Sequence, residues 1–335
     1  MIKISGYLTC RNAAQMNYPF VESIKSLLDF CDEVIVADSS DGGDDTLNIL
    51  KSLADKHSKL KVYHVNVPWD APNHGVYDGQ MKAMARSKCT GDYLWQSDLD
   101  EVVDAGSRKK IEDLLEKAGP TMEQVPILCL PVVEYWGPNG KSRIDVNPWK
   151  WRLSKNLPYI THGIPANLRK WENGLLYAKQ GTDGCDYIHK TTGEVIPSAN
   201  FMNAEIEQMR REAINNSEVA KKYSIWFSMV CEALPYVHHY SWYSISGKIL
   251  KFKNFWNNSW LSLYNEKKPE GWNPFFANKS LKEVSEQEII ALGEKLEAET
   301  GGHIFHAPWN GTKINHFTFD KKHPTNMKNW CKKNK

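Results

Sequence analysis

Short apolar runs alternate with amphipathic stripes along the first hundred residues. The runs are nearly continuous in apolar character, which is typical of strands that are covered on both faces. Between them, apolar residues recur three and four positions apart, which indicates helices. The pattern predicts strands at residues 2–8, 33–37, 61–67 and 93–96, and helices that begin at Pro19, near Leu47 and at Gly75.

This alternation with short connections predicts an α/β fold with a mostly parallel central sheet flanked by helices. In such a sheet the crossovers are right-handed, and ligands bind beyond the carboxyl ends of the strands. Polar residues stand at three of these predicted ends: Arg11 after the first strand, Asp38 after the second, and Asp98 and Asp100 after the fourth. We therefore expect these residues to belong to one site.

The acidic stretch Asp98, Asp100 and Glu101 follows the large apolar residues of the fourth strand. Side chains two positions apart in an extended chain project to the same side, so Asp98 and Asp100 can face one ligand. Their hard oxygen atoms suit Mg²⁺ or Mn²⁺ that carries a phosphorylated substrate. An isolated Asp-x-Asp is more often a solvated acidic loop, but its place at a strand end favours the metal site.

The second half of the chain is less regular. Its pattern predicts a helix capped by Ser107, strands at 126–136 and 149–153, turn-rich loops with short strands over 158–196, helices at 203–222 and 225–234, and a late helix behind a capping box of Ser285 and Glu288. Lysines at 248, 251 and 253 lie on a further helical stretch.

The composition is that of an ordinary globular protein, with 41% hydrophobic and 24% charged residues. Seven cysteines, an odd number without a Cys-x-x-Cys pair, indicate reduced and buried thiols rather than disulfides or a zinc site. The start of the chain has no signal-like segment, and no apolar run is long enough to span a membrane. We therefore expect a cytoplasmic protein.

Charge is unevenly distributed. The net charge is +2, but from Ser241 to the end 15 lysines stand against 9 acidic residues, which gives +6 there and −4 before it. A basic end of this kind can meet an anionic partner, although a solvated terminus explains it equally well.

Several motifs in order resemble the GT-A glycosyltransferases of the family-2 type, which move a sugar from a nucleotide sugar. They are Arg11-Asn12, the run from Val34 to Asp38-Ser39-Ser40-Asp41, Lys82 to Ala85, Thr90-Gly91-Asp92-Tyr93, Asp98-Leu99-Asp100-Glu101, His239-Tyr240-Ser241-Trp242 and His323-Pro324. The similarity is strong over residues 1–105, moderate at 236–256 and 305–328, and poor at 120–200. Lys82 stands where the family usually has Arg.

The resemblance implies a GT-A fold with a helical C-terminal extension. It divides the chain into a nucleotide-sugar-binding half at residues 1–104, an acceptor-binding half at 105–242, and a basic, aromatic extension at 243–335. It also implies Mn²⁺ or Mg²⁺ as cofactor. The metal ligands would be Asp100 first, then Asp98 and His239, whose nitrogen suits Mn²⁺ better than Mg²⁺. For His239, packing in an aromatic cluster is an equally good reading, and His238 competes for the role.

Donor contacts are implied for Thr9, Arg11, Asp38, Asp41, Lys82, Asp98, Lys248 and Lys251. The alternative for Asp38 is a turn-stabilising side chain, and for each cation a surface charge. If the reaction inverts the anomeric centre, a general base is required. The candidates for this base are Asp186, Asp183 and Glu101, with Glu134 also near the acceptor side.

Trp136, His162 and Trp242 are the candidate acceptor contacts, with core packing as the alternative for the tryptophans. The acceptor would be a saccharide of an envelope glycan or a hydroxymethylated DNA base, and a UDP-sugar is the favoured donor. A nucleotidyltransferase and a non-catalytic sugar-binding module are the competing functions. The former normally has a glycine-rich phosphate loop after the first strand, and residues 9–14 contain no glycine. Donor sugar, stereochemistry and oligomeric state stay open.

Overall fold

The computed structural model describes residues 2–67, 74–163, 169–172, 175–178, 186–254, 283–299, 314–319 and 322–334. The chain divides into two compact units. The first unit comprises residues 1–130 and 150–200, and the second comprises residues 131–149 and 201–335. Each unit contains two stretches of chain, and the predicted boundaries after residues 104 and 242 stay predictions.

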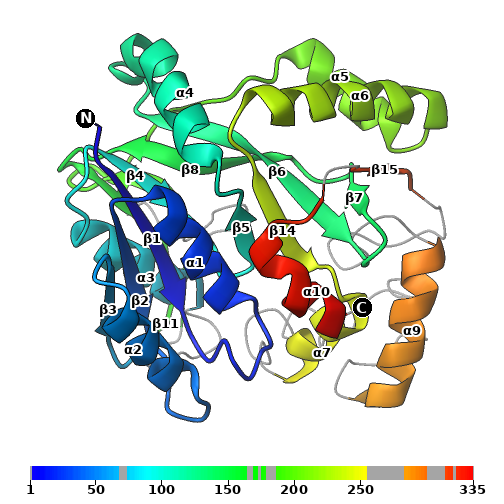
Figure 1. The fold of residues 1–335 in the computed structure, drawn as a ribbon, viewed down its shortest axis with the longest axis horizontal. Coiled ribbons are helices and arrows are strands. Elements are labelled where there is room, and N and C mark those ends of the chain that lie inside the picture. Colours follow the sequence, from blue (N-terminus) through cyan, green and yellow to red (C-terminus); the bar gives the residue numbers. More distant parts are fainter. Residues whose placement is uncertain are drawn as a thin grey trace. The chain divides into compact units, whose positions relative to one another are not determined.

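A mostly parallel sheet forms the centre of the first unit (Figure 1). Its order is β8-β4-β1-β2-β3. Strands β1 to β4 run parallel, and β8 pairs with β4 in the antiparallel sense. The strands are β1 (Ile4–Cys10), β2 (Glu33–Asp38), β3 (Leu60–His64), β4 (Tyr93–Gln96) and β8 (Trp149–Lys155). The predicted α/β class with a mostly parallel sheet is confirmed.

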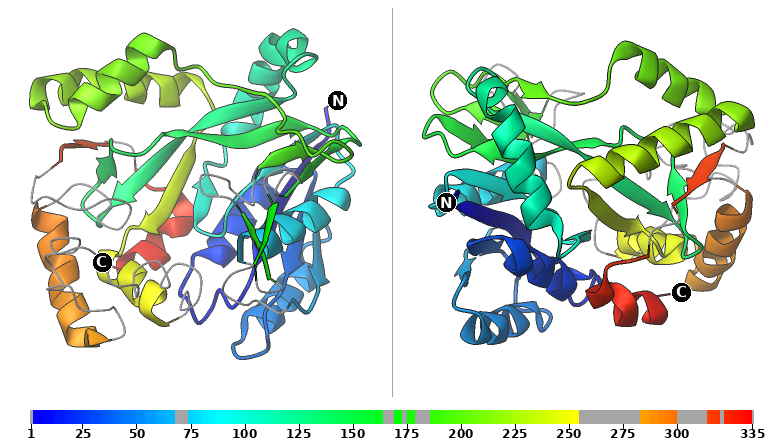
Figure 2. Two further views of the ribbon diagram at one scale, coloured as in Figure 1. Left: turned by 180° about the vertical axis from the view of Figure 1, so that it is seen from behind. Right: turned by 45° about the horizontal axis from the view of Figure 1, so that its top comes forward.

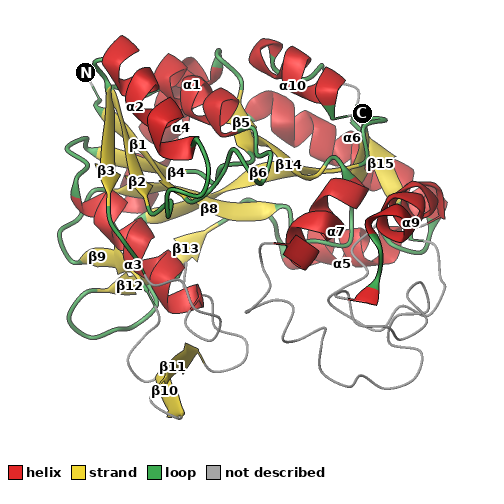
Figure 3. Cartoon of the chain, turned by 90° about the horizontal axis from the view of Figure 1, so that it is seen from below, coloured by secondary structure: helices red, strands yellow, loops and turns green. Residues whose placement is uncertain are grey.

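Helices cover both faces of this sheet. Figure 3 shows α1 (Phe20–Phe30) and α2 (Thr46–Lys56) on one face and α3 (His74–Ser87) on the other. Helix α1 buries Ile24 and Leu27 completely, which are spaced as its sequence pattern predicts. Each such side chain stabilises the fold by about 1.5–3 kcal/mol relative to an exposed position.

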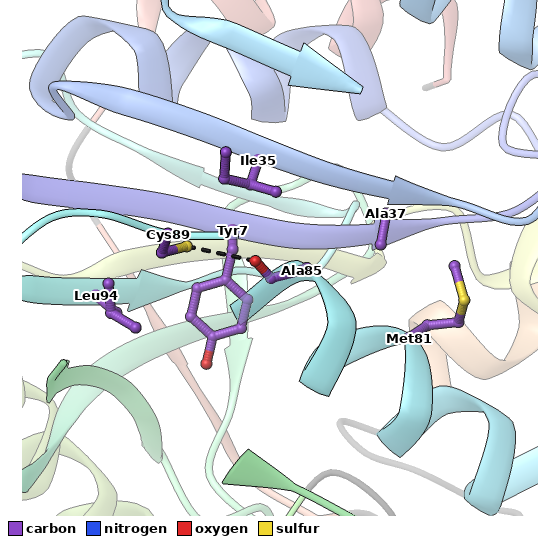
Figure 4. Packing of buried hydrophobic residues seen from close by; sticks show 7 residues of the cluster. All are labelled: Tyr7, Ile35, Ala37, Met81, Ala85, Cys89 and Leu94. Atoms are coloured by element: carbon purple, nitrogen blue, oxygen red, sulfur yellow. Dashed lines mark hydrogen bonds between the residues drawn. The ribbon is translucent and has the colours of Figure 1, made fainter. Parts of the chain in front are cut away.

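The α3 face of the sheet has a compact apolar core (Figure 4). It is built by residues of β1, β2, β4 and α3, together with Cys89: Tyr7, Ile35, Ala37, Met81, Ala85, Cys89 and Leu94. The Cys89 thiol donates to the carbonyl of Ala85 at 3.5 Å, and burial raises its pKa to about 12. The six cysteines within the described residues are free and buried, as predicted, and Cys185 lies outside them.

The remaining elements of the first unit connect or extend this layer. They are β5 (Glu101–Val103), α4 (Ser107–Met122), β13 (Ser198–Ala199), and the antiparallel pairs β9 (Ile160–His162) with β12 (Tyr187–His189) and β10 (Arg169–Glu172) with β11 (Leu175–Ala178). The predicted cap at Ser107 is wrong, because Gly106 occupies the N-cap and no side chain caps the helix.

A second group of strands belongs to the second unit. Strand β6 (Ile127–Trp136) belongs to the second unit from Pro131 onward. Strand β14 (Val237–Trp242) pairs with β6 in the parallel sense. On the other edge, β7 (Lys141–Arg143) pairs with β6 and with β15 (His316–Thr318) in the antiparallel sense.

Helices make up most of the rest of the second unit within its described residues. They are α5 (Ala204–Ala213), α6 (Ser217–Ala233), α7 (Ile245–Asn254), α9 (Glu286–Glu299), the 3₁₀ turn η5 (Thr325–Met327) and α10 (Lys328–Lys333). Helices α5 and α6 lie side by side in both views of Figure 2. They separate at Asn216, whose side chain accepts from two backbone amides of α6, so the predicted boundary at 222–225 is wrong.

The predicted capping box precedes α9. The backbone amide and hydroxyl of Ser285 donate to the Glu288 carboxylate at 2.7 and 2.8 Å, and the Glu288 amide donates to the Ser285 hydroxyl at 3.2 Å. Within the described part of the chain, no helix is both long and apolar enough to cross a membrane.

Candidate donor-binding site

The parallel register of the first unit aligns the carboxyl ends of its strands. Cys10 is paired with Asp38, Asp38 with His64, and Tyr7 with Gln96. Residues that follow these positions therefore lie along one edge of the sheet. The sheet brings together the segments that contain Arg11, Asp38 and Asp98, as predicted from their places at strand ends.

Asp38 is completely buried at this edge. Its carboxylate accepts from the Ser40 hydroxyl at 2.7 Å and from the Ser40 amide at 3.3 Å. The Nδ1 atom of His64 lies 2.7 Å from Oδ2 of Asp38, the oxygen that also accepts from the Ser40 amide. Asp38 thus stabilises the turn after β2, which was the alternative reading of this residue. His64 was not singled out from the sequence, because only the pairing of β2 with β3 places it there.

The loop after β1 is joined to the turn after β2. Asn12 adopts a left-handed backbone conformation, with φ of 44°. Its amide donates to the Ser40 hydroxyl at 3.0 Å, and its side-chain oxygen accepts from the Asp41 amide at 3.2 Å. Beside it, burial lowers the pKa of Arg11, while the nearby charge of Asp41 opposes that shift. The two loops are therefore fixed to each other by side chains of both.

Two buried cations compensate the charges of Asp98 and Glu101 in the acidic stretch after β4. Lys82 donates to Asp98 Oδ1 at 3.1 Å, and Arg152 donates to Asp98 Oδ2 at 3.0 Å. The same Arg152 nitrogen also forms an ion pair with Glu101, which is fully buried. Gln96 links the group, because its amide donates to Asp98 and its carbonyl accepts from Arg152. Asp98 and Glu101 are therefore held in a charge-balanced network.

Arg152 is the residue of this network that the sequence analysis missed. It lies in β8, and burial alone would lower the pKa of its guanidinium. The charges of Glu101 and then Asp98 outweigh that effect and raise the pKa above its ordinary value. An arginine between Trp151 and Leu153 of a predicted strand was the available signal, since buried charges are paired in stable proteins.

Asp100 is 7% exposed and stands at the candidate metal position. Its carboxylate is the type of ligand that Mg²⁺ and Mn²⁺ prefer. No cluster of three or more His, Cys, Asp or Glu residues arranged to hold a metal occurs in the described ranges. A divalent ion that carries a nucleotide takes only one or two carboxylates from the protein, with phosphate and water as other ligands. The residues present are compatible with that kind of binding.

In the second unit, His239 and Glu134 form a close pair, with Nδ1 of the ring 2.7 Å from Oε2 of the carboxylate. Lys248 donates to the Ser241 hydroxyl at 2.7 Å and lies over the ring of Trp242 at 5.9 Å. His238, the competing histidine, is fully buried against Tyr135. The prediction that Asp100 and His239 share a metal stays a prediction, because they belong to different units.

Two predicted acceptor contacts of the second unit pack against each other. The rings of Trp136 and Trp242 have centroids 5.4 Å apart, and both side chains are buried. In the first unit, His162 is buried and its Nε2 lies 2.6 Å from the Tyr7 hydroxyl. These contacts favour core packing over acceptor binding for all three residues.

The remaining predicted residues are scattered over several elements. Thr9 is half-buried near the end of β1, and Lys251 is half-buried on α7. Asp186 precedes β12, where its carbonyl accepts from the Gly163 amide at 3.2 Å. Asp183 lies outside the described residues. Their proposed roles as donor contacts and as a general base stay predictions.

Among solved structures, TarS from S. aureus aligns with 88% of this chain and 51% of its own, at 14% identity and a TM-score of 0.36. The structure of TarS residues 1–349 in complex with UDP-GlcNAc aligns with 96% of this chain and 98% of its own, at 15% identity and a TM-score of 0.33. The mannosyltransferase PcManGT from Pyrobaculum calidifontis, in complex with GDP-Man and Mn²⁺, aligns with 46% of this chain and 44% of its own, at 13% identity and a TM-score of 0.31.

This chain therefore spans about half the length of the full TarS structure. Likenesses at these TM-scores and identities carry no conclusion about substrate. No curated protein sequence matches the chain. The family model "Glycosyl transferase family 2" matches residues 7–163, which run from within β1 through β4 and the acidic stretch after β4. This segment is slightly less than half of the chain, and through it the chain is similar to glycosyl transferase family 2.

Proposed function

We propose that the enzyme transfers a sugar from a nucleoside-diphosphate sugar, with a UDP-sugar as the favoured donor, to an acceptor hydroxyl in the presence of a divalent cation. The observation that supports this most is the aligned edge of the first unit, where the loops after β1, β2 and β4 meet. Ligands of α/β sheets bind at such an edge. The donor would lie against Arg11, Asp38 and Asp98 there.

Asp100 is the proposed cation ligand of the first unit. Both carboxylate oxygens of Asp98 already accept from Lys82, Gln96 or Arg152, so Asp98 suits a positioning role or a contact with the donor's hydroxyls. Glu101 is buried against Arg152, which favours orientation of the acidic stretch over proton abstraction. A bound Mn²⁺ or Mg²⁺ would neutralise the charge that grows on the leaving diphosphate.

Asp186 is the proposed general base if the reaction inverts the anomeric centre. It lies in the turn-rich part of the first unit, and acceptor contacts are commonly placed on such loops. Arg11, Lys82 and Lys248 are proposed phosphate contacts. In the free protein Lys82 is paired with Asp98 and Lys248 with Ser241, so each would exchange that partner for phosphate.

The acceptor is proposed to be a saccharide of an envelope glycan or a hydroxymethylated base of DNA. The second class is motivated by exposed lysines on α10, Lys328, Lys332 and Lys333. Binding to DNA releases counterions and weakens steeply as salt rises. Turnover that falls steeply between about 50 and 200 mM salt on a hydroxymethylated duplex would support DNA. Turnover on saccharides that does not change with salt concentration would exclude DNA as the acceptor.

A thermal-unfolding panel of nucleoside diphosphates and nucleotide sugars, with and without Mn²⁺, tests the donor proposal. A ligand present at about one hundred times its dissociation constant stabilises the folded protein by about 2.7 kcal/mol. We expect Mn²⁺ to strengthen stabilisation by UDP or a UDP-sugar, and Asp100→Asn to remove the Mn²⁺-dependent part. The control is Asp113→Asn, which alters an exposed carboxylate on α4 paired with Lys109. Absence of stabilisation by every nucleoside diphosphate would overturn the proposal.

A further inference from the structure

Glu134 and His239 face each other across two parallel strands of the second unit. Their Cα atoms are partners in the register of β6 with β14. The ring nitrogen Nδ1 of His239 lies 2.7 Å from Oε2 of Glu134. The Glu134 side chain is 9% exposed and the His239 side chain 16%, so water competes little for this contact.

The chemistry of the two groups fixes the direction of the hydrogen bond. An ionised carboxylate has no proton and only accepts, so Nδ1 of His239 must carry the hydrogen. A neutral imidazole has a single N–H, and Nε2 then holds the lone pair. In histidines that bind metals, a carboxylate that accepts from the other ring nitrogen commonly sets the tautomer and the orientation of the ring.

A fixed positive charge accompanies the carboxylate. Arg143 is buried and places NH1 3.9 Å from Oε1 of Glu134. Its guanidinium is held in place by Asp145, which accepts from Nε at 3.0 Å and from NH2 at 2.6 Å. The ring of Trp136 lies 5.8 Å from the same guanidinium. Glu134 therefore shares the positive charge of Arg143 with Asp145, which holds the guanidinium more closely.

The neighbouring histidines meet different partners. Nδ1 of His238 lies 2.7 Å from the Tyr135 hydroxyl, and Nδ1 of His323 lies 3.0 Å from the Tyr240 hydroxyl. A phenol can donate or accept, so it leaves the tautomer of its histidine undetermined. A carboxylate leaves no such choice for His239.

We propose that Glu134 is a positioning residue that holds the proton of His239 on Nδ1 and its lone pair on Nε2. In its neutral form His239 would then present a lone pair, and no N–H, at Nε2, which is the arrangement that a nitrogen ligand for a divalent cation requires. The cation's part in donor binding rests on the proposed function. The tautomer itself is a property of the free protein and is measured without donor or metal.

The test is a long-range ¹H–¹⁵N correlation spectrum of the full chain labelled with ¹⁵N-histidine, at an alkaline pH where the ring is neutral. His239→Gln assigns the signals. We expect the wild type to show the proton on Nδ1 and the lone pair on Nε2. In Glu134→Leu, which has no acceptor, we expect the proton to move at least partly to Nε2.

Glu134→Gln serves as the second variant if the leucine protein does not fold. Its amide can accept from Nδ1 or donate to it, so we expect a mixture of both tautomers. The matched control is Glu207→Gln, which alters a carboxylate of the second unit that pairs with Arg210 and Arg211. The control should leave the His239 signals unchanged.

A wild-type spectrum with the proton on Nε2, or an unchanged tautomer in both Glu134 variants, would overturn the inference. Neither result depends on whether the protein binds a nucleotide sugar. If UDP and Mn²⁺ have no effect on the wild type, the proposed function fails while the tautomer result still stands.

Discussion

Replacement of Arg152 by methionine should reveal how strongly the acidic stretch after β4 depends on a single buried cation. The substitution keeps much of the apolar stem and removes the guanidinium. Glu101 is completely buried and would lose its cation, and Oδ2 of Asp98 would lose the same partner. Methionine also cannot donate the hydrogen bond that the Gln96 side-chain carbonyl now accepts from the guanidinium.

Removal of one partner from a buried ion pair costs about 3–5 kcal/mol, because the remaining charge stays buried. The two carboxylates should not contribute equally. The side chain of Asp98 is 38% exposed, so water can solvate it, whereas that of Glu101 is not exposed. We therefore expect Glu101→Gln to rescue Arg152→Met more than Asp98→Asn does, by about 1 kcal/mol or more.

Urea unfolding of the wild type, the single variants and the two double variants measures these coupling energies. Far-ultraviolet circular dichroism and tryptophan fluorescence should be recorded together, because coincident transitions show whether two-state treatment holds for a chain of two units. A cost below about 1 kcal/mol for Arg152→Met would refute the reasoning. Equal or greater rescue by Asp98→Asn would refute the assignment of the buried charge to Glu101.

The remaining predictions concern the opposite end of the same sheet and one helix. Burial alone would raise the pKa of Glu33, but hydrogen bonds from Ser5 and Thr90 and the contact with Lys61 lower it from 4.5 to about 2. The ionised Glu33 side chain therefore stabilises the folded protein by about 3 kcal/mol above pH 4.5, and this stabilisation is lost as the pH falls towards 2. The difference in free energy of unfolding between the wild type and Glu33→Gln, measured with urea, should therefore become smaller from pH 6 to pH 3. Gly91→Ala should lower the free energy of unfolding by about 1–3 kcal/mol, because a Cβ there would lie 2.8 Å from the Ser5 amide nitrogen. Gly119→Ala in α4, where a Cβ meets nothing within 4 Å beyond its chain neighbours, should change it by less than about 1 kcal/mol, because the gain in helix propensity is opposed by the contact of the new Cβ with Pro120. A larger loss for Gly119→Ala than for Gly91→Ala in urea unfolding would contradict both expectations.

The elements of the first unit were predictable because their signals are local. Strand β4 has the predicted bounds, since large apolar residues are bracketed by Gly91 and the acidic stretch. The position of Asp38 at the end of β2 was also predictable. The site edge then follows from the parallel register, which a strand–helix alternation implies.

Partners that depend on long-range pairing were not predictable. Arg152 reaches Asp98 only because β8 lies antiparallel to β4, with Leu153 opposite Trp95. His64 reaches Asp38 through the pairing of two parallel strands. A hydrophobic pattern defines which side of a strand is apolar, but it does not specify which strand lies beside it.

Helix boundaries failed for a different physical reason. Ser107 has the chemistry of a cap, but the chain enters α4 one residue earlier, at Gly106. Asn216 was read as part of a longer helix, yet its side chain binds the amides of Glu218 and Val219 and starts a new one. Asparagine and serine compete with the helical backbone for hydrogen bonds, and the winner depends on local geometry.

The conformation of Asn12 has a consequence for how this protein can change during evolution. The position needs a residue that tolerates a left-handed backbone and also offers a side-chain oxygen to the Asp41 amide. Glycine meets the first need only, a β-branched residue meets neither, and aspartate would add a negative charge beside Asp41. Few of the twenty amino acids can therefore replace Asn12 while the loops after β1 and β2 stay joined. The sequence of the loop after β1 should therefore drift slowly, whatever ligand the rest of the protein comes to select.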